Sequence, residues 1–330
     1  MPRVFLTGGS GFIGGELVAA LRERGDEVIA LGHTDASARA LATRGVQVVR
    51  GDVLDAGALI SGMSGCDIVY HVAGINSHCP KDPAHLLRVN VSGTENVVRA
   101  AARCGIGRVV FTSSAASIGE AKGEVGTEDS PHRGHYLSAY DRSKHEGERL
   151  AFRAAAETGI AAIALNPSSV QGPPRTSGNG AIIIAFLNGR LRAFVDTYVS
   201  VVDVRDVVEA HLLAGDRGRS GRRYILNGST MTSGDALQLV SDISGLQTRV
   251  PLVPRHVARG AATIVDWFFR MRGKTSPICR ARVNTILHGH RYDGSLAMRE
   301  LGLRYTPVAE TFRRTIEWAV AEGLVTRLNR

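Results

Sequence analysis

Thr7-Gly8-Gly9-Ser10-Gly11-Phe12-Ile13-Gly14 is the stretch that decides the fold. It follows the apolar run Val4-Phe5-Leu6 and opens a helical pattern, so spaced glycines stand where a strand turns into a helix. Glycine leaves room for a ligand to approach the backbone, and the free amides at a helix N-terminus bind anionic groups. The stretch therefore predicts a dinucleotide pyrophosphate site around Gly8, Gly11 and Gly14. Close strand-to-helix packing without a ligand is the alternative.

Short apolar runs alternate with helical periodicity through the first half of the chain, a pattern typical of a parallel sheet covered on both faces. We expect strands near residues 4–7, 28–31, 46–50, 68–71, 109–112 and 161–165. We expect helices near residues 12–24, 36–42, 56–62, 83–103 and 139–156. The chain is thus predicted to be an α/β protein built on a doubly wound parallel sheet.

The sequence changes character beyond Pro167, where Gly, Pro and Ser become frequent. Further strands at 199–202 and 224–226, separated by a helix at 204–214, are expected to return to the main sheet. A short helix is expected at 181–188, and residues from 233 onward read as mostly helical. We therefore assign 1–170 with 198–228 to a dinucleotide-binding domain, and 171–197 with 229–330 to a smaller, mostly helical substrate-binding lobe.

Tyr140 and Lys144 are the first candidates for catalysis. On a helix the i, i+4 spacing brings both side chains to one face, so the ammonium can favour the ionised phenol and lower its pKa. Tyr-x-x-x-Lys arises often by chance, but no other tyrosine of this chain has a lysine four residues later. Ser114 ends the fifth predicted strand, where its hydroxyl could polarise a carbonyl beside Tyr140. Ser113 or Thr112 could share that role.

The end of the second predicted strand bears on the choice of cofactor. An acidic residue there binds the free ribose hydroxyls of NAD and repels a 2′-phosphate. Gly32 stands in its place, which favours NADP, with His33, Thr34 and Arg39 near the phosphate. NAD remains the alternative, because a small shift could bring Asp35 to the ribose.

Asp52, in Gly51-Asp52-Val53 at the end of the third strand, could accept a hydrogen bond from the adenine amine or could cap a helix. Neither a G-x-S-x-G nor an H-E-x-x-H motif occurs, so the common hydrolase patterns are not met. We expect no metal site. Four histidines are expected to be structural or pocket-lining rather than metal ligands: His71, His78, His132 and His135.

Charge and cysteine content bear on whether the protein binds nucleic acid and on the compartment in which it is found. The net charge of +9 comes from arginines scattered along the chain, and without a helix-turn-helix or aromatic pattern it predicts no nucleic-acid binding. Neither C-x-x-C pairing nor metal-ligand spacing is present, so we expect reduced packing cysteines and a cytoplasmic protein. The cysteines are Cys66, Cys79, Cys104 and Cys279.

No apolar run is long enough to span a bilayer, and no signal peptide is predicted. The basic amphipathic segment from Arg255 to Lys274 could lie on a membrane surface. We predict instead that it covers a substrate pocket, because aromatic faces such as Trp267, Phe268 and Phe269 are usually buried.

Together these residues resemble the extended short-chain dehydrogenase/reductase family over essentially the whole chain. The finer resemblance is to its dihydroflavonol-reductase-like branch, which includes 3β-hydroxysteroid dehydrogenases and bacterial proteins labelled hopanoid-associated sugar epimerases. The family segments are residues 7–14, 51–53, 71–74 and 89–94 with Ser114, Tyr140 and Lys144. Those of the branch are 166–169, 186–190, 292–293 and 300–302.

The resemblance implies a Rossmann fold, nicotinamide chemistry and roles for single residues. Tyr140 would be the acid/base, Lys144 would hold the nicotinamide ribose and lower the tyrosine pKa, and Ser114 would bind the substrate oxygen. Asn90 would fix local structure. The cofactor-binding residues would also include Phe12, Ile13, Val53, Ala73, Gly74, Pro167, Ser169 and Val170.

One segment departs from the sugar-nucleotide members of the family. They carry an arginine in an R-D-Y-I-H-type segment that grips the substrate diphosphate, and residues 199–203 lack it. The expected lid is apolar, with Ile182, Ile183, Ile184, Phe186 and Phe194. We therefore expect a reductase or dehydrogenase for a hydrophobic or ring-containing small molecule.

Two other functions stay open, a sugar-nucleotide epimerase or dehydratase and a non-catalytic dinucleotide sensor. By analogy with relatives, the helices at 83–103 and 139–156 could form a homodimer contact.

Overall fold

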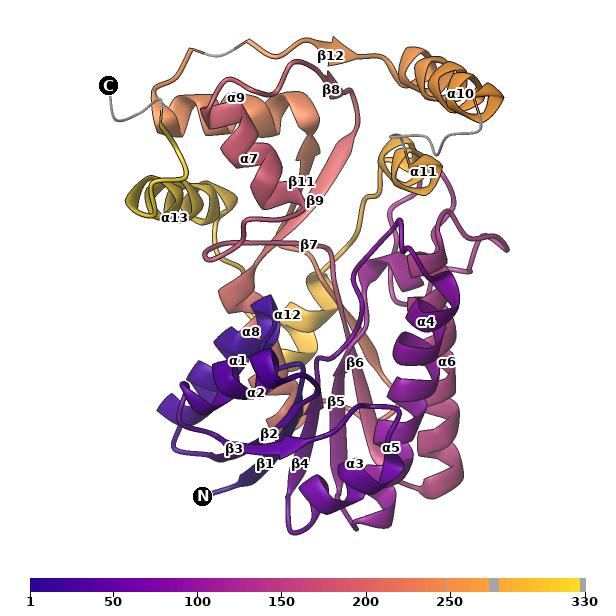
Figure 1. Cartoon of the computed structure of the whole chain (residues 1–330), viewed down its shortest axis with the longest axis vertical. Helices are drawn as coiled ribbons and strands as arrows, with labels where there is room; N and C mark the ends of the chain where they lie inside the picture. Colours follow the sequence, from indigo (N-terminus) through magenta and orange to yellow (C-terminus); the bar gives the residue numbers. More distant parts are fainter. Residues whose placement is uncertain (248, 273–278, 327–330) are drawn as a thin grey trace.

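The computed structural model describes residues 1–247, 249–272 and 279–326. Within them a seven-stranded parallel sheet runs in the order β10-β6-β5-β4-β1-β2-β3 (Figure 1). Its strands are β1 Arg3–Thr7, β2 Glu27–Gly32, β3 Gln47–Arg50, β4 Ile68–His71, β5 Arg108–Thr112, β6 Ala161–Pro167 and β10 Arg223–Leu226. The strand order reverses between β1 and β4, and doubly wound sheets bind ligands at the carboxyl ends of their strands at such a switch point.

Helices cover both faces of this sheet, each over its own hydrophobic core. α1 and α8 pack on one face, and α3, α5 and α6 pack on the other. These helices and their neighbours are α1 Phe12–Glu23, α2 Asp35–Ala42, α3 Ala56–Met63, α4 Pro83–Leu87, α5 Gly93–Arg103, α6 Ala139–Thr158 and α8 Val204–Arg217. The helix predicted over 83–103 is interrupted by a π-helical turn, Arg88–Ser92.

The second sheet corrects one prediction. β9 (Tyr198–Asp203) was expected in the main sheet, but it pairs with β7 (Ser169–Gln171) and β11 (Ser229–Thr232). The chain continues beyond β6 into β7, which offers β9 a hydrogen-bonding partner past the carboxyl end of the main sheet. β10 does return to the main sheet, beside β6.

The upper part of Figure 1 is a mostly helical lobe around a smaller core. Residues of α7, α9 and α13 form this core with Val201 of β9. The remaining elements are α7 Asn179–Leu187, β8 Phe194–Val195, α9 Ser233–Ser244, β12 Leu252–Val253, α10 Arg255–Met271, α11 Arg280–His288, α12 Ser295–Leu301 and α13 Val308–Ala321. α12 packs instead with α8 in the core of the main sheet.

α10 lies at the outer edge of the lobe (Figure 1). Five of its large apolar residues are exposed: Val257, Ile264, Trp267, Phe268 and Met271. Trp267 is 60% exposed and Ile264 66% exposed. The prediction that this segment buries its aromatic face over a pocket is therefore wrong, and Lys274 lies outside the described residues. Among the helices that are described, none combines the length and the apolar character needed to cross a membrane.

Candidate active site

The glycine turn between β1 and α1 forms a cradle that side chains would fill. Gly8 has φ +78°, and a Cβ there would lie 2.5 Å from the backbone nitrogen of Ala73. A Cβ on Gly14 would collide with the carbonyl oxygen of Gly8. Gly11 is the N-cap of α1, with no side-chain cap and no acidic residue in the first turn. This helix end can therefore accept an anionic group, and the cradle fits the pyrophosphate of a dinucleotide.

A buried chain of hydrogen bonds fixes the neighbouring strand ends. The backbone nitrogen of Ala73 donates to Thr7 Oγ1 at 3.2 Å, and that hydroxyl lies 2.7 Å from His71 Nδ1. His71 Nε2 lies 3.0 Å from Thr94 Oγ1. Burial, assisted by the charge of Lys144, lowers the pKa of His71 to about 3, so the ring is neutral and structural.

Tyr140 lies in the first turn of α6, whose N-cap is Ser138. Its side chain is buried, and Ser114, at the end of β5, interacts with the phenol. Burial raises the pKa of Tyr140, whereas the Ser114 hydroxyl and the charge of Arg175 act in the opposite direction. The two residues that were predicted from different parts of the chain therefore meet.

Lys144 lies one turn further along α6 and is half-buried. Its Nζ donates to the carbonyl oxygen of Thr112 at 2.9 Å, and a Cβ on Gly74 would lie 3.3 Å from it. Burial lowers the pKa of Lys144 to about 8. The pKa of Tyr140 is raised, chiefly by burial, and Lys144 is not among the groups that shift it. The role of Lys144 in lowering the tyrosine pKa therefore stays a prediction.

The alternatives to Ser114 have structural partners. Thr112 Oγ1 lies 2.7 Å from His211 Nε2, and Ser113 Oγ donates to Glu148 Oε2 at 2.5 Å. Neither hydroxyl is directed at Tyr140. Ser114 Oγ accepts from the nitrogen of Ala116 at 3.2 Å, and it is the hydroxyl at this strand end that interacts with the phenol.

Asn90, in the π-helical turn, ties the loop after Gly74 to α6. Its Oδ1 accepts from the nitrogen of Ile75 at 2.7 Å, and its Nδ2 donates to Ser143 Oγ at 2.9 Å. π-Helical turns are frequent at functional sites. This geometry agrees with the local structural role that the family resemblance implies for Asn90.

The end of β2 explains why Gly32 replaces an acidic residue. A Cβ at Gly32 would lie 3.1 Å from both Ala38 Cα and Val48 Cγ1, so a side chain there would require α2 or Val48 to shift by a few tenths of an ångström. Asp35, which could have reached the ribose, forms an ion pair with Arg50 at 2.8 Å. Sequence reasoning did not single out Arg50, because only the register of β2 and β3 places it opposite Gly32.

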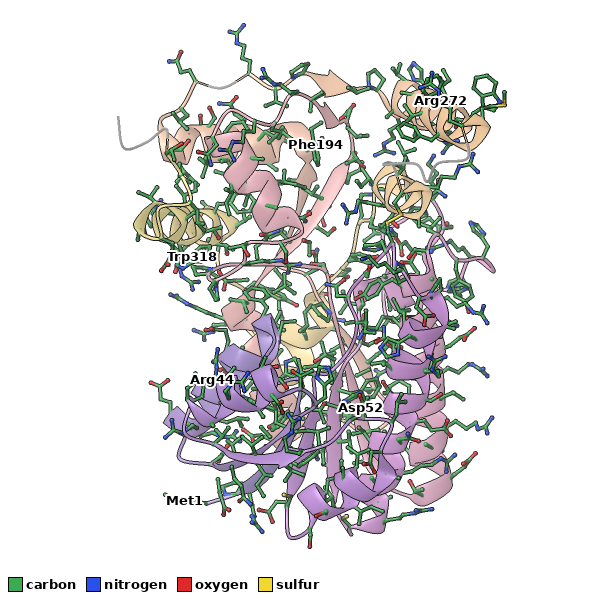
Figure 2. The ribbon with its side chains drawn as sticks, in the orientation of Figure 1. Met1, Arg44, Asp52, Phe194, Arg272 and Trp318 are labelled. Carbon is green, nitrogen blue, oxygen red and sulfur yellow. A yellow bond between two sulfur atoms is a disulfide. The ribbon has the colours of Figure 1, made fainter. Side chains whose placement is uncertain are left out.

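The predicted phosphate residues His33, Thr34 and Arg39 are all exposed. Thr34 is the N-cap of α2, and its Oγ1 accepts from the nitrogen of Ser37 at 3.1 Å. One oxygen of Asp52, which Figure 2 labels in the sheet domain, accepts from the nitrogen of Leu54 at 2.9 Å. That bond makes Asp52 part of its own turn, but the N-cap of α3 is Asp55, so the helix-cap alternative for Asp52 is wrong.

Pro167 ends β6, and Ser169 and Val170 lie in β7 directly beyond it. This segment follows the strand next to β5, so it lies near Ser114. The carbonyl oxygen of Val170 accepts from Arg175 Nη1 at 2.6 Å. The same guanidinium stacks over the Phe12 ring at 5.2 Å. Arg175 therefore connects the glycine cradle to the tyrosine, a placement that no sequence motif indicated.

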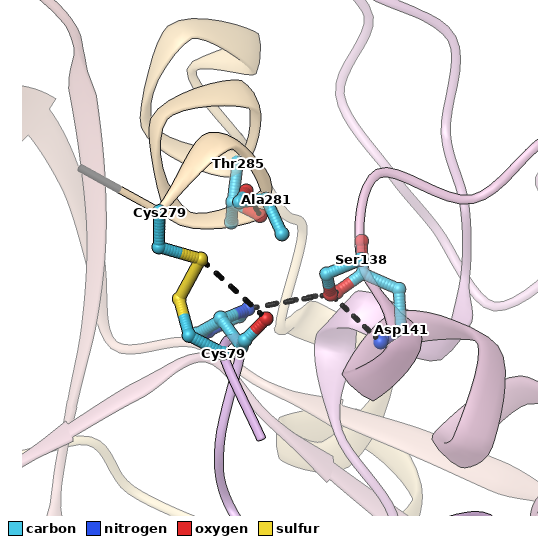
Figure 3. The surroundings of a disulfide bond; sticks show 7 residues. Cys79, Ser138, Asp141, Cys279, Ala281 and Thr285 are labelled. Carbon is cyan, nitrogen blue, oxygen red and sulfur yellow. Dashed lines mark hydrogen bonds and ion pairs between the residues drawn. A yellow bond between two sulfur atoms is a disulfide. The ribbon is translucent and has the colours of Figure 1, made fainter. Parts of the chain in front are cut away.

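A disulfide close to Ser138, the N-cap of α6, corrects another prediction (Figure 3). Cys79 and Cys279 are bonded, with Cα atoms 6.2 Å apart, although they are separated by 200 residues. His78, next to Cys79, presents an edge to the Tyr140 ring with 5.0 Å between centroids. The expectation of reduced cysteines is wrong for this pair, whereas Cys66 and Cys104 are free. The cytoplasmic location loses the support that it took from the cysteines.

The expected apolar lid is also partly wrong. Ile183, Ile184 and Phe186 belong to the core that α7 shares with α9 and α13, so they stabilise the lobe itself. Phe194, labelled in Figure 2, lies in the lobe and is half-buried. Asp203, in the segment that lacks the diphosphate-binding arginine, forms an ion pair with Arg314 of α13 at 2.9 Å.

Comparison with known proteins places this fold and site in a family. The class is that of Rossmann-fold enzymes that use a nicotinamide dinucleotide, and a model of the NAD dependent epimerase/dehydratase family matches residues 4–227. The chain belongs to this family. Together with its reductase relatives, this makes it an NAD(P)-dependent enzyme of the extended short-chain dehydrogenase/reductase type.

Three relatives show how far the similarity extends. A putative dihydroflavonol 4-reductase of Synechocystis sp. is 34% identical, covering 97% of this chain and 95% of its own. Sterol demethylase protein B of Methylococcus capsulatus is 32% identical, covering 97% and 99%. The crystal structure of gox2253 matches with a TM-score of 0.88 at 27% identity, covering 99% of this chain and 100% of its own.

Proposed function

We propose that the protein interconverts a carbonyl and an alcohol on a hydrophobic or ring-containing small molecule. The observation that carries this proposal is that Ser114 meets the buried Tyr140 phenol at the carboxyl end of β5, beside Lys144, whose Nζ donates to the carbonyl oxygen of Thr112. The names of two relatives, a dihydroflavonol reductase and a sterol demethylase protein, support a ring-containing substrate.

In the proposed reaction, Ser114 binds the substrate oxygen and Tyr140 exchanges a proton with it. A bound nicotinamide supplies hydride to the carbonyl carbon in reduction and receives it in oxidation. The raised pKa keeps the Tyr140 phenol protonated near neutral pH, so it is ready to donate its proton as the carbonyl is reduced. Lys144 holds the nicotinamide ribose, from its position beside Gly74.

The proposed cofactor residues follow the carboxyl ends of the strands from β2 to β7. Gly8, Gly11 and Gly14 would hold the pyrophosphate, and Ala73 and Gly74 would lie close to the cofactor. The others are Phe12, Ile13, His33, Thr34, Arg39, Asp52, Val53, Tyr140, Lys144, Pro167, Ser169 and Val170. The two-domain division of the chain is likewise part of the proposal.

We propose NADP rather than NAD as the preferred cofactor. Arg50 neutralises Asp35 at the end of β2 and β3, and Arg39 is exposed nearby on α2, so the surroundings favour a 2′-phosphate. Arg50→Ala should weaken NADP binding about tenfold or more and leave NAD binding nearly unchanged. Equal losses for both cofactors in a titration would contradict this assignment.

A sugar-nucleotide epimerase or dehydratase is the second candidate, because the matching family includes both activities. In that reaction hydride returns to the substrate, so the cofactor shows no net change. A thermal-shift comparison of NADP and NAD, followed by a carbonyl panel read as NADPH absorbance at 340 nm, separates the two. Substrate turnover without net loss of absorbance would favour the epimerase.

We also propose a homodimer through α4, α5 and α6, by analogy with relatives. Sedimentation should give twice the chain mass. A monomer at micromolar concentration would contradict it.

A further inference from the structure

Three side chains converge in the interior, at the loop that leads from β5 to α6: Glu120, His288 and His290. Glu120 lies between β5 and α6, His288 ends α11, and His290 follows two residues later. Glu120 Oε1 lies 2.5 Å from His290 Nδ1 and 3.4 Å from His288 Nε2. The side chains are 1%, 5% and 15% exposed for Glu120, His288 and His290, respectively.

Protein groups do not satisfy this cluster. Among the described residues, Glu120 Oε2, His288 Nε2 and His290 Nε2 find no hydrogen-bond partner. A buried polar atom without a partner costs about 1–3 kcal/mol. Of these atoms, His288 Nε2 faces Glu120 Oε1 at 3.4 Å without forming a hydrogen bond, which leaves it free to bind a ligand between the two side chains.

The donor set identifies the kind of ligand. One carboxylate with two imidazoles is a common set for zinc, whereas calcium and magnesium prefer oxygen ligands. One candidate ligand atom from each residue lies within 4.8 Å of the others. Tetrahedral zinc places its ligands about 3.3 Å apart. The 3.4 Å between Glu120 Oε1 and His288 Nε2 already matches this spacing. His290 Nδ1, now 2.5 Å from Glu120 Oε1, would have to move away from it by roughly 1 Å to reach the same spacing.

We propose that Glu120, His288 and His290 bind one divalent transition-metal ion of the zinc type. The Tyr292 hydroxyl lies 3.0 Å from His290 Nδ1 and helps to hold this ring in place. A carboxylate–imidazole network without metal is the alternative, and it would leave His288 Nε2 without a hydrogen bond. The proposal departs from our sequence expectation, because 168 residues separate Glu120 from His288 and no motif spans that distance.

The segment around the cluster is held in place before any ion binds. The carbonyl oxygen of His290 accepts from Ser200 Oγ at 3.1 Å, and Tyr292 forms a β-bridge with Gly126. The closed surroundings fit a structural ion rather than one that contacts substrate.

The ion would fix the end of α11 to the loop that leads to Tyr140. Arg133 donates to the carbonyl oxygen of Glu120 at 3.4 Å and forms an ion pair with Asp141, also at 3.4 Å. The disulfide between Cys79 and Cys279 secures the opposite end of α11 (Figure 3). The three ligands are therefore positioning residues for the site, and they do not touch the reacting atoms.

The test uses the full chain, purified and then treated with a chelator. Zinc chloride should bind with one equivalent and raise the melting temperature by about 4 °C at saturating concentration. His288→Gln and His290→Gln should both lose this uptake. His85→Gln, at an exposed histidine, is the matched control and should bind like the unaltered protein.

Cobalt(II) gives a second readout that does not depend on stability. Tetrahedral cobalt bound by imidazole and carboxylate absorbs visible light, and Glu120→Gln should weaken or abolish that band while circular dichroism stays unchanged. If the unaltered chain takes up neither metal, or if the His288→Gln and His290→Gln variants take up the same amount, the proposal is overturned.

Discussion

The substitution Gly11→Ala is expected to weaken cofactor binding while leaving the protein folded. Gly11 has φ −84° and ψ 179°, a conformation that alanine adopts without strain. A Cβ there would meet one atom, the carbonyl oxygen of Gly8 at 3.2 Å, so a shift of a few tenths of an ångström accommodates it. The free energy of unfolding should fall by about 1 kcal/mol or less. Gly8 and Gly14 are unsuitable for this test, because a Cβ at either would collide with backbone atoms.

The loss of NADP-binding free energy should be larger than this loss of stability. The added methyl group occupies the helix N-terminus that we assign to the pyrophosphate, and a hydrogen bond to a charged group is worth about 1.5–3 kcal/mol. Losing one such bond raises the dissociation constant of NADP by about 10-fold to 150-fold. Calorimetry measures this constant, and urea unfolding measures the stability of the same sample.

Gly107→Ala is the matched control, because a Cβ there meets nothing within 4 Å. It should bind NADP like the unaltered protein. A folded Gly11→Ala variant with unchanged affinity would refute the pyrophosphate cradle.

Two further predictions concern stability. Burial lowers the pKa of His211 to about 4. Below about pH 6.5 this histidine binds a proton in the unfolded protein but not in the folded protein, so the free energy of unfolding decreases as the pH is lowered. Between pH 7.5 and 5.0 the unaltered protein should lose about 2 kcal/mol relative to His211→Gln in urea unfolding, and a constant difference would contradict this. The disulfide closes a loop of 200 residues, so reductant should cost the protein about 2–5 kcal/mol. A variant carrying both Cys79→Ser and Cys279→Ser should show no response to reductant in a thermal melt, and an equal response would count against the pairing.

The main sheet was predictable because its signals are local. Its inner strands are apolar runs buried on both faces, and each predicted strand of the first half lies within two residues of the observed bounds. The glycine turn and the Ser114–Tyr140 pairing follow from positions at strand and helix ends. These positions are set by the fold class, so sequence order was enough to bring them together.

The predictions that were wrong depend mostly on contacts between segments that are far apart in the sequence. Nothing near Cys79 indicates that α11 will bring Cys279 beside it. β9 has the alternation of a sheet strand, but its partner depends on where the chain goes after β6. The face of α10 was predicted as buried from its composition alone, yet it lies at the edge of the lobe. The pKa of Tyr140 depends on burial, which the i, i+4 spacing cannot show.

The central claim is that Tyr140 transfers the proton at a nicotinamide site, and Tyr140→Phe tests it most directly. The substitution removes only the hydroxyl that contacts Ser114, so NADP affinity should stay within about twofold while turnover falls by about 10²–10⁴. Tyr136→Phe, at an exposed tyrosine of the same segment, is the control and should keep full turnover. Unchanged turnover in Tyr140→Phe, with the cofactor still bound, would contradict the account.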